Sequence, residues 1–191
     1  MSKIKIDQRF SPYQMPCAII GTIVEEKPNF MLCTWLSRVN RNPPVWMVSI
    51  NKKHYSMKGI KLSGNFSINF PSTEFIMKID YIGITSGKDK DKSSLFNMFY
   101  GDTKVPMIME FPLTIELSVK DLIELSDHFI VLGTAINSYF DEKCQTYGFP
   151  DIKKMKPIIY TGVEKNQTYW SVGEKVGDAF KLGKEYKDSN Y

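Results

Sequence analysis

The sequence lacks most of the short motifs that announce a particular chemistry. It contains no GxGxxG and no GxxxxGK[ST], which excludes Rossmann-type and P-loop phosphate binding. It also has no GxSxG nucleophile elbow. Its two histidines, His54 and His128, have no cysteine, histidine or acidic neighbour at metal-ligand spacing. We therefore predict that the chain holds no metal.

Cysteines and long apolar runs are scarce as well. Cys17, Cys33 and Cys144 are an odd number with no CxxC spacing, which is typical of reduced cytosolic thiols. The first residues, MSKIKIDQRF, have no apolar core of a signal peptide. No window approaches the roughly 18 apolar residues that a membrane span needs. We expect a soluble cytoplasmic protein that does not bind membranes.

Charge is not concentrated anywhere in the chain. The net charge is +4, but no run of five or more lysines and arginines occurs. Nucleic-acid binding usually needs a concentrated basic stripe, so we expect no nucleic-acid partner. With 191 residues, 42% of them hydrophobic, the chain can bury a core without disulfides. We expect a single domain over residues 1–191.

The most frequent pattern in the sequence is the one typical of β-strands. Strict alternation is clearest from Leu113 to Val119, and Phe129–Phe140 would pair with it as a hairpin. Gly133 inside the second strand suggests a bulge or a close backbone approach. Four more strands are expected at Cys17–Val24, Phe30–Leu36, Val45–Ile50 and Asn65–Phe70. At least six strands with scattered helices predict a small, mainly β barrel.

Three helices are expected around this barrel. Lys53–Leu62 could make one or two turns, and Ser72 can cap a helix whose apolar residues recur at helical spacing. A C-terminal helical extension is expected at about 169–186, where apolar residues alternate with lysine and glutamate.

The stretch from Asn29 to Asn51 offers the first candidate site. Between its two apolar runs lies a polar loop with Arg38 and Arg41, closed by two prolines and adjacent to Trp35. Hydroxyls, backbone N–H groups and guanidiniums beside an indole suit an anion attached to a flat ring, such as a nucleotide. The alternative is an ordinary hairpin with a solvated loop.

A second polar segment, Thr85–Ser94, carries mixed lysines and aspartates. One interpretation is a solvated surface loop. The other is a flexible arm whose Lys88, Lys90 and Lys92 can reach a phosphate.

Six stretches of the sequence carry a more specific signal than these general patterns. They are MPCAIIGT, KPNFMLCTWLSRVNRNPPVWMVSI, NFSINFPS, DYIGITSGKDKDK, SDHFIVLG and YWSVGEKVGDAFKLGK, from about residue 12 to 186. In this order they resemble the flavin reductase-like, FMN-binding split-barrel family, and within it the flavoredoxin branch.

The resemblance implies a six-stranded antiparallel split β-barrel of Greek-key type with a few flanking helices. It also implies a homodimer with non-covalent FMN near the dimer interface. Carried over position by position, the cofactor-binding residues would be Asn29, Thr34, Trp35, Ser37, Ser49, Ile50, Asn51, Ser56, Lys92, His128 and Tyr160. Lys92 would reach the phosphate, and His128 would lie near the flavin and a nicotinamide, as the one candidate catalytic residue.

The function that this resemblance implies is an FMN-dependent oxidoreductase. It would take electrons from NAD(P)H or a redox protein and pass them to an acceptor. Two alternatives stay open at this point: an FMN-binding electron carrier with no NAD(P)H activity, and a binding module that holds a ligand without redox turnover.

Overall fold

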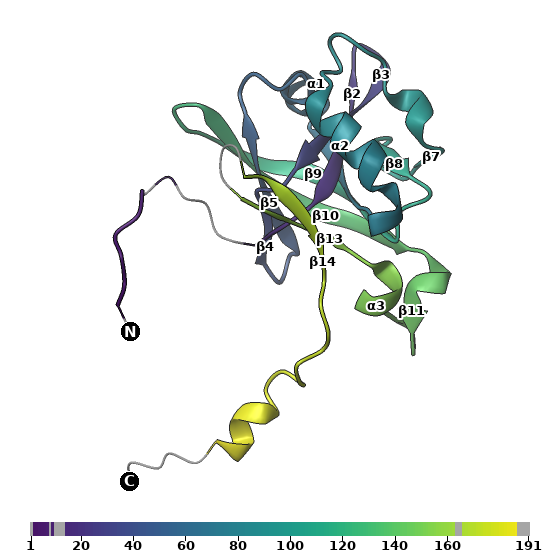
Figure 1. Cartoon of the computed structure of the whole chain (residues 1–191). Coiled ribbons are helices and arrows are strands. Elements are labelled where there is room, and N and C mark those ends of the chain that lie inside the picture. The colour runs from purple at the N-terminus through teal and green to yellow at the C-terminus, as the bar shows by residue number, and fades with distance from the viewer. Residues whose placement is uncertain (1, 8, 10–13, 163–165, 187–191) are drawn as a thin grey trace.

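The fold is built on one antiparallel sheet of seven strands (Figure 1). The computed structural model describes residues 2–7, 9, 14–162 and 166–186. The strand order is β3-β2-β6-β9-β10-β5-β4. The bounds are β2 Ala18–Val24, β3 Lys27–Cys33, β4 Leu36–Asn40, β5 Val45–Asn51, β6 Asn65–Phe70, β9 Leu113–Glu124 and β10 His128–Phe140. The mainly β, antiparallel prediction is confirmed, with one strand more than the six expected.

The two edges of this sheet are joined by a link of only two residues. β3 and β4 stand at opposite ends of the strand order, yet only Thr34 and Trp35 separate them along the chain. The three Cα–Cα steps from Cys33 to Leu36 span at most about 11 Å. The sheet must therefore curl until its edges meet, and β3 approaches β5 there. This link makes the sheet a barrel that is closed at one place and split elsewhere.

Alternate side chains fill the barrel because successive residues of a strand face opposite sides. The inner cluster includes Ile20, Val48, Phe66, Ile115 and Val131. Helix α1, Ser56–Ser63, packs against β2, and α2, Ile76–Ile84, packs against β3 (Figure 1). A second cluster around Ile79 and Phe111 lies between α2 and the outer face of the sheet. The helical turns predicted in Lys53–Leu62 and after Ser72 are confirmed.

Smaller elements surround the barrel. A three-stranded sheet has the order β1-β13-β14, and two short ribbons pair β7 with β8 and β11 with β12. Their bounds, with those of the short helices, are β1 Met15–Pro16, β7 Met98–Tyr100, β8 Pro106–Ile108, β11 Gln145–Thr146, β12 Phe149–Pro150, β13 Ile158–Thr161, β14 Thr168–Ser171, α3 Ile152–Met155, η1 Thr73–Phe75, η2 Ser93–Leu95, η3 Glu142–Cys144 and η4 Leu182–Glu185.

Gly133 lies at a bulge and also at a close backbone approach, so both predictions for it are confirmed. The register between β9 and β10 shifts between Leu132 and Gly133, which is a bulge. A Cβ atom at Gly133 would lie 2.6 Å from the Phe66 ring, so the backbone also approaches that ring closely. The bulge bends the long hairpin over the barrel core.

Two expectations are wrong. The polar residues after Leu36 form strand β4 rather than a loop, because the open edge of β5 pairs with them while Leu36 turns into the core. Of the helix expected at about 169–186, the described residues form only the short 3-10 helix η4, Leu182–Glu185. Thr168–Ser171 pair with β13, and 172–178 carry no regular structure, since Gly173 and Gly177 disfavour a helix there.

The single domain expected over residues 1–191 extends beyond what is described, since residues 1 and 187–191 lie outside the described ranges. Within those ranges, no helix has the length and apolar character of a bilayer span.

Candidate functional site

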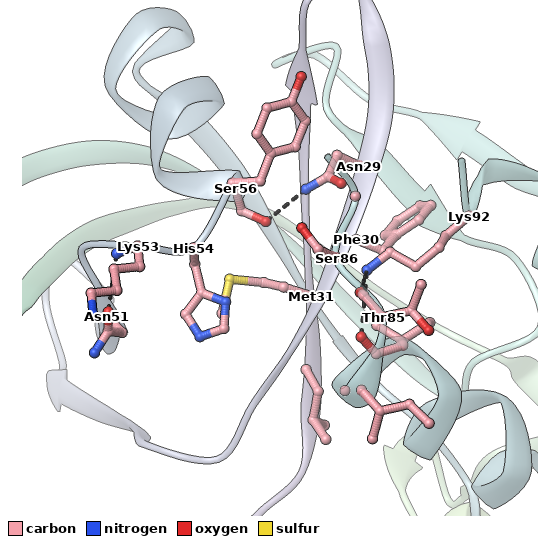
Figure 2. A pocket seen from close by; sticks show the side chains of 16 residues that line it. Asn29, Phe30, Met31, Asn51, Lys53, His54, Ser56, Thr85, Ser86 and Lys92 are labelled. Atoms are coloured by element: carbon pink, nitrogen blue, oxygen red, sulfur yellow. Dashed lines mark hydrogen bonds between the residues drawn. The ribbon is translucent and has the colours of Figure 1, made fainter. Parts of the chain in front are cut away.

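A cavity of about 320 Å³ opens where β3, the end of β5, the start of α1 and the segment after α2 come together (Figure 2). Lys53, His54 and Lys92 line it. None of the residues described around it is an aspartate or glutamate. α1 begins at this cavity with Ser56, so the positive end of its dipole adds to the cationic side chains. The cavity is therefore suited to an anion.

Lys92 is the buried charge of this cavity. The residue is 4% exposed, and its Nζ donates hydrogen bonds to the carbonyl oxygens of Thr85 at 2.7 Å and Ile82 at 3.4 Å (Figure 2). Burial lowers the pKa of Lys92 to about 8. Its two acceptors are neutral carbonyls, which compensate a charge only in part. An anion in the cavity would supply the missing counter-charge.

The segment that carries Lys92 is packed against the barrel and is not a freely moving arm. A Cβ at Gly87 would collide with the Asn29 side chain, so the backbone at 87 lies directly on that residue. Both alternatives considered for Thr85–Ser94 missed this packing. Lys88 and Lys90 line a neighbouring cavity of about 250 Å³, together with Lys92 and several acidic residues.

Asn29 and Ser56 form a buried polar pair on the opposite wall. The Asn29 Nδ2 donates to the Ser56 Oγ at 2.7 Å (Figure 2). Because the serine oxygen accepts this bond, its own hydroxyl proton is available to an acceptor in the cavity. The pair thus places one oriented hydroxyl donor among the cationic groups.

A second cavity of about 170 Å³ continues the first toward the Thr34–Trp35 link. The two cavities share Met31, Leu32, Asn51 and His54. In the second one the Trp35 indole stacks on the His128 imidazole, with ring centroids 5.1 Å apart and planes 25° apart. One continuous site therefore combines a cationic end with an aromatic end.

The two histidines of the chain meet in this second cavity. The Nδ1 of His128 lies 2.9 Å from the Asp127 carboxylate, and hydrogen bonding from His128 lowers the pKa of Asp127. That contact orients the ring. Burial, and to a smaller extent the nearby His128 and Lys92, lowers the pKa of His54, which favours its neutral form.

Eight of the eleven predicted cofactor residues line one of these cavities. The first holds Asn29, Asn51, Ser56 and Lys92, and the second holds Thr34, Trp35, Ser49, Asn51 and His128. Ser37 is exposed on β4, Ile50 is fully buried in the barrel, and Tyr160 packs edge-on against Tyr169 from β13. These three line neither cavity, and a cofactor role for them stays a prediction.

The arginines of the hairpin lie outside the site as well. Arg38 donates to the carbonyl oxygens of Asn40 and Arg41, and both arginines line a separate shallow hollow. The hypothesis of an anion held by this loop is therefore not supported by their placement. The cavity suited to an anion is lined instead by the start of α1 and the segment after α2.

Sequence reasoning missed several lining residues, among them Lys53, His54, Thr85, Ser86 and Gly87. A Ser-Gly pair such as Ser86-Gly87 is typical of a turn. No local pattern ties it to Asn29, which lies far away in the chain. Only the packing of α1 and α2 against β2 and β3 brings these segments together.

Comparisons with known proteins agree with this geometry. The family model described as the flavin reductase like domain matches residues 10–159. The structure is similar to the crystal structure of a flavoredoxin from Methanosarcina acetivorans, with 42% identity and a TM-score of 0.93, covering 96% of this chain and 98% of that one. A flavoredoxin of Desulfovibrio vulgaris (Miyazaki F) is 32% identical at a TM-score of 0.86, with 96% and 100% covered.

One curated relative is less informative. An uncharacterized protein of Aeropyrum pernix is 26% identical over 136 residues, which is 69% of this chain and 51% of that protein. The chain thus spans about half the length of that relative.

Proposed function

The chain belongs to the flavin reductase-like domain family, and from this membership we propose that it is an FMN-dependent oxidoreductase. It would take electrons from NAD(P)H or a redox protein and pass them through bound FMN to an acceptor. The observation that carries the proposal is the continuous site with a carboxylate-free cationic end and an aromatic end. This shape matches a molecule with a phosphate at one end and a flat ring at the other.

The residues at the cationic end fit a phosphate. A phosphomonoester carries about −1.5 to −2 charges at pH 7. Lys92, with an incompletely compensated charge, and the Ser56 hydroxyl are suitable donors, and Asn29 fixes that hydroxyl. The cavity volumes of about 320 and about 170 Å³ together fall in the range of roughly 300–1,000 Å³ typical of small-molecule sites.

The aromatic end would bind and orient the ring. FMN, when bound, supplies the ability to accept a hydride or single electrons. Trp35 and His128 would wall the ring, and Asp127 would hold the His128 imidazole in one orientation. His128, whose Nδ1 lies against the Asp127 carboxylate, is the residue proposed to meet a nicotinamide or to exchange a proton. The apolar atoms of Met31 and Leu32 would exclude water.

The test is the colour and the reactivity of the purified protein. We expect a yellow protein that releases FMN on acid or heat treatment. Mixed with NADH or NADPH without air, it should lose its flavin absorbance. A colourless protein that also fails to take up added FMN would contradict the proposal.

The same experiment separates the two alternatives. An electron carrier would keep its yellow colour with NADH and NADPH but bleach with a reduced redox protein. A binding module without redox turnover would bleach with neither, and dithionite would then be the only effective reductant.

A homodimer and a cytoplasmic location belong to the proposal. An exposed apolar groove on the body, described below, supports the homodimer. The free thiols of Cys17, Cys33 and Cys144 support a reducing compartment. Sedimentation of a single species near 22.0 kDa at micromolar concentration would contradict the homodimer.

A further inference from the structure

The chain after β14 leaves the body as an extended arm (Figure 1). We define residues 172–186 as the C-terminal arm. Its backbone hydrogen bonds are local, from Lys181 and Leu182 to Asp178 and from Tyr186 to Gly183. Among the described residues, neither buried apolar cluster includes a side chain beyond Tyr169. Apart from the exposed ion pair between Glu174 of the arm and Lys153 of α3, at 3.2 Å, the arm is held to the body through β14.

The arm presents large apolar side chains to water. Val176 is 96% exposed and Phe180 95%, and Leu182 and Tyr186 are also exposed. Monomeric proteins rarely leave such side chains together without a function. The charges between them are partly paired, since Lys175 lies 2.5 Å and Lys181 3.6 Å from the Asp178 carboxylate. Such pairing lowers the cost of removing the arm from water.

A groove on the body presents a matching apolar surface. It encloses about 530 Å³ and is lined mostly by apolar side chains: Met15, Pro16, Trp35, Leu36, Met47, Leu125 and Ile130, with Gln14, Thr34 and Ser49. We call it the apolar groove. Trp35 and Leu125 are 45% exposed, so the groove is open to a partner.

The topology places the base of the arm beside this groove. β14 pairs with β13, and β13 pairs with β1, whose Met15 and Pro16 line the groove. A two-fold interface is isologous, so it presents the same patch from both copies. A two-fold dimer through this face would therefore put each arm next to the groove of the other copy.

From this juxtaposition we propose that the arm of one copy lies in the apolar groove of a second copy. In Figure 1 the arm runs away from its own body, as an exchanged arm would. A stable interface needs about 800 Å² from each partner. Exposed aromatic side chains bury roughly 150–250 Å² each. Phe180 and Tyr186 of the arm, together with Trp170 of β14, could therefore supply roughly 450–750 Å² of that area. Val176 and Leu182 add to it.

The exchange would complete the flavin site, and this part rests on the proposed function. The apolar groove and the aromatic end of the site share Thr34, Trp35 and Ser49. A partner arm in the groove would cover the face of Trp35 that is now exposed. The proposal thus adds one feature to the proposed homodimer: each flavin site would have a wall contributed by the other copy.

The first test is a photo-cross-link from the arm. In the full chain, Phe180→p-benzoylphenylalanine is irradiated, and the products are separated by denaturing electrophoresis and mapped by mass spectrometry. We expect a covalent dimer with links to groove residues such as Met47 or Ile130. The matched control places the probe at Leu62, which is 82% exposed on α1, and should give no dimer. Links only within one chain, or none to the groove, would overturn the proposal.

The second test is the self-association of charged variants. Val176→Asp combined with Phe180→Asp should weaken the dimer at least tenfold in sedimentation, whereas Leu62→Asp should leave it unchanged. An unchanged dimer in the arm variant would overturn the proposal. FMN uptake is measured separately on the unaltered chain. A dimer that cross-links through the groove but takes up no FMN would contradict the proposed function alone, and a yellow protein with an unlinked arm would contradict only the arm exchange.

Discussion

Lys92 and Glu116 are the two charged side chains buried in the described part of the chain. They differ in how completely their charge is hydrogen-bonded. Glu116 accepts hydrogen bonds from the backbone N–H and hydroxyl of Thr103, from Asn137 and from Tyr139, at 2.7–2.9 Å. Burial alone would raise the pKa of Glu116, but these bonds lower it to about 2. Lys92 has only two carbonyl acceptors, and burial lowers its pKa to about 8.

The difference separates a charge that is fully bonded within the fold from a charge that is still available to a ligand. Glu116 ties the 101–104 turn to β10, and all its contacts come from the chain itself. Lys92 faces the first cavity, whose described lining residues include no aspartate or glutamate. A fully bonded buried charge stabilises the native state, whereas an incompletely bonded one costs stability until a partner arrives.

Removing each charge should therefore change stability in different ways. Glu116→Leu leaves several partly buried donors without an acceptor, at about 1–3 kcal/mol each, so a loss of more than about 3 kcal/mol is expected. Lys92→Met removes a desolvated charge and should change the flavin-free protein by less than about 1 kcal/mol. Urea unfolding without flavin measures both.

The control for this pair is Glu124→Gln, an exposed carboxylate on the same strand as Glu116, with an expected change within about 0.5 kcal/mol. If Lys92→Met lowers the free energy of unfolding as much as Glu116→Leu does, the contrast between the two buried charges is wrong.

The next effect concerns the ligand. If Lys92 binds the FMN phosphate, Lys92→Met should weaken FMN by about 1.5–3 kcal/mol, the range for a hydrogen bond to a charged group. Riboflavin, which lacks the phosphate, should bind the variant and the unaltered protein almost equally. Because Lys92 is buried, added salt should change this loss little.

Fluorescence titration with the two flavins measures these affinities, and Lys90→Met, in the same segment but outside the first cavity, is the matched control. If Lys92→Met weakens the binding of FMN and of riboflavin equally, Lys92 does not bind the phosphate.

A smaller effect is expected at the aromatic end. Trp35→Ala removes a stacked ring and should weaken FMN and riboflavin alike, by about 1–2 kcal/mol, since aromatic pairs contribute about 0.5–1.5 kcal/mol beyond their buried area. The same titrations measure it, with a thermal melt to confirm folding. A folded Trp35→Ala protein with unchanged affinities would place the ring elsewhere.

The smallest effect is a pH dependence. A phosphate prefers protonated Lys92, so the affinity for FMN should fall as pH rises above the Lys92 pKa of about 8. Loss of one proton limits the slope to about tenfold per pH unit. Riboflavin, measured from pH 7 to 9.5, corrects for titration of the ring itself. If FMN and riboflavin follow the same pH profile, Lys92 is not the titrating group.

The sequence predicted the barrel well because strand pattern is local. The alternation at Leu113–Val119 and the run at Phe129–Phe140 became the central hairpin, with the irregularity at Gly133 where it was expected. The Ser37–Asn42 segment failed for a physical reason. An edge strand exposes both faces of its polar residues, so its composition resembles that of a loop.

The site was predicted in part, and its cationic end depended on resemblance. Nothing in the alternating lysines and aspartates shows that Lys92 is buried while Lys88 and Lys90 are exposed. That distinction arises from the fit of Gly87 on Asn29 and from the carbonyls at the end of α2. Such contacts join residues far apart in sequence, and composition does not record them.

The Thr34–Trp35 link has a topological consequence. The barrel is a ring whose last joint is a stretch of covalent chain, since β3 and β4 are not paired in the sheet. Its circumference at that joint is fixed by chain length and cannot change by slippage of strand register. A circular permutant with new termini between Thr34 and Trp35 would keep every ladder and yet open the ring. The aromatic end of the site contains Thr34 and Trp35. In the permutant these two residues would no longer be held in place by the chain, while the rest of the fold remained.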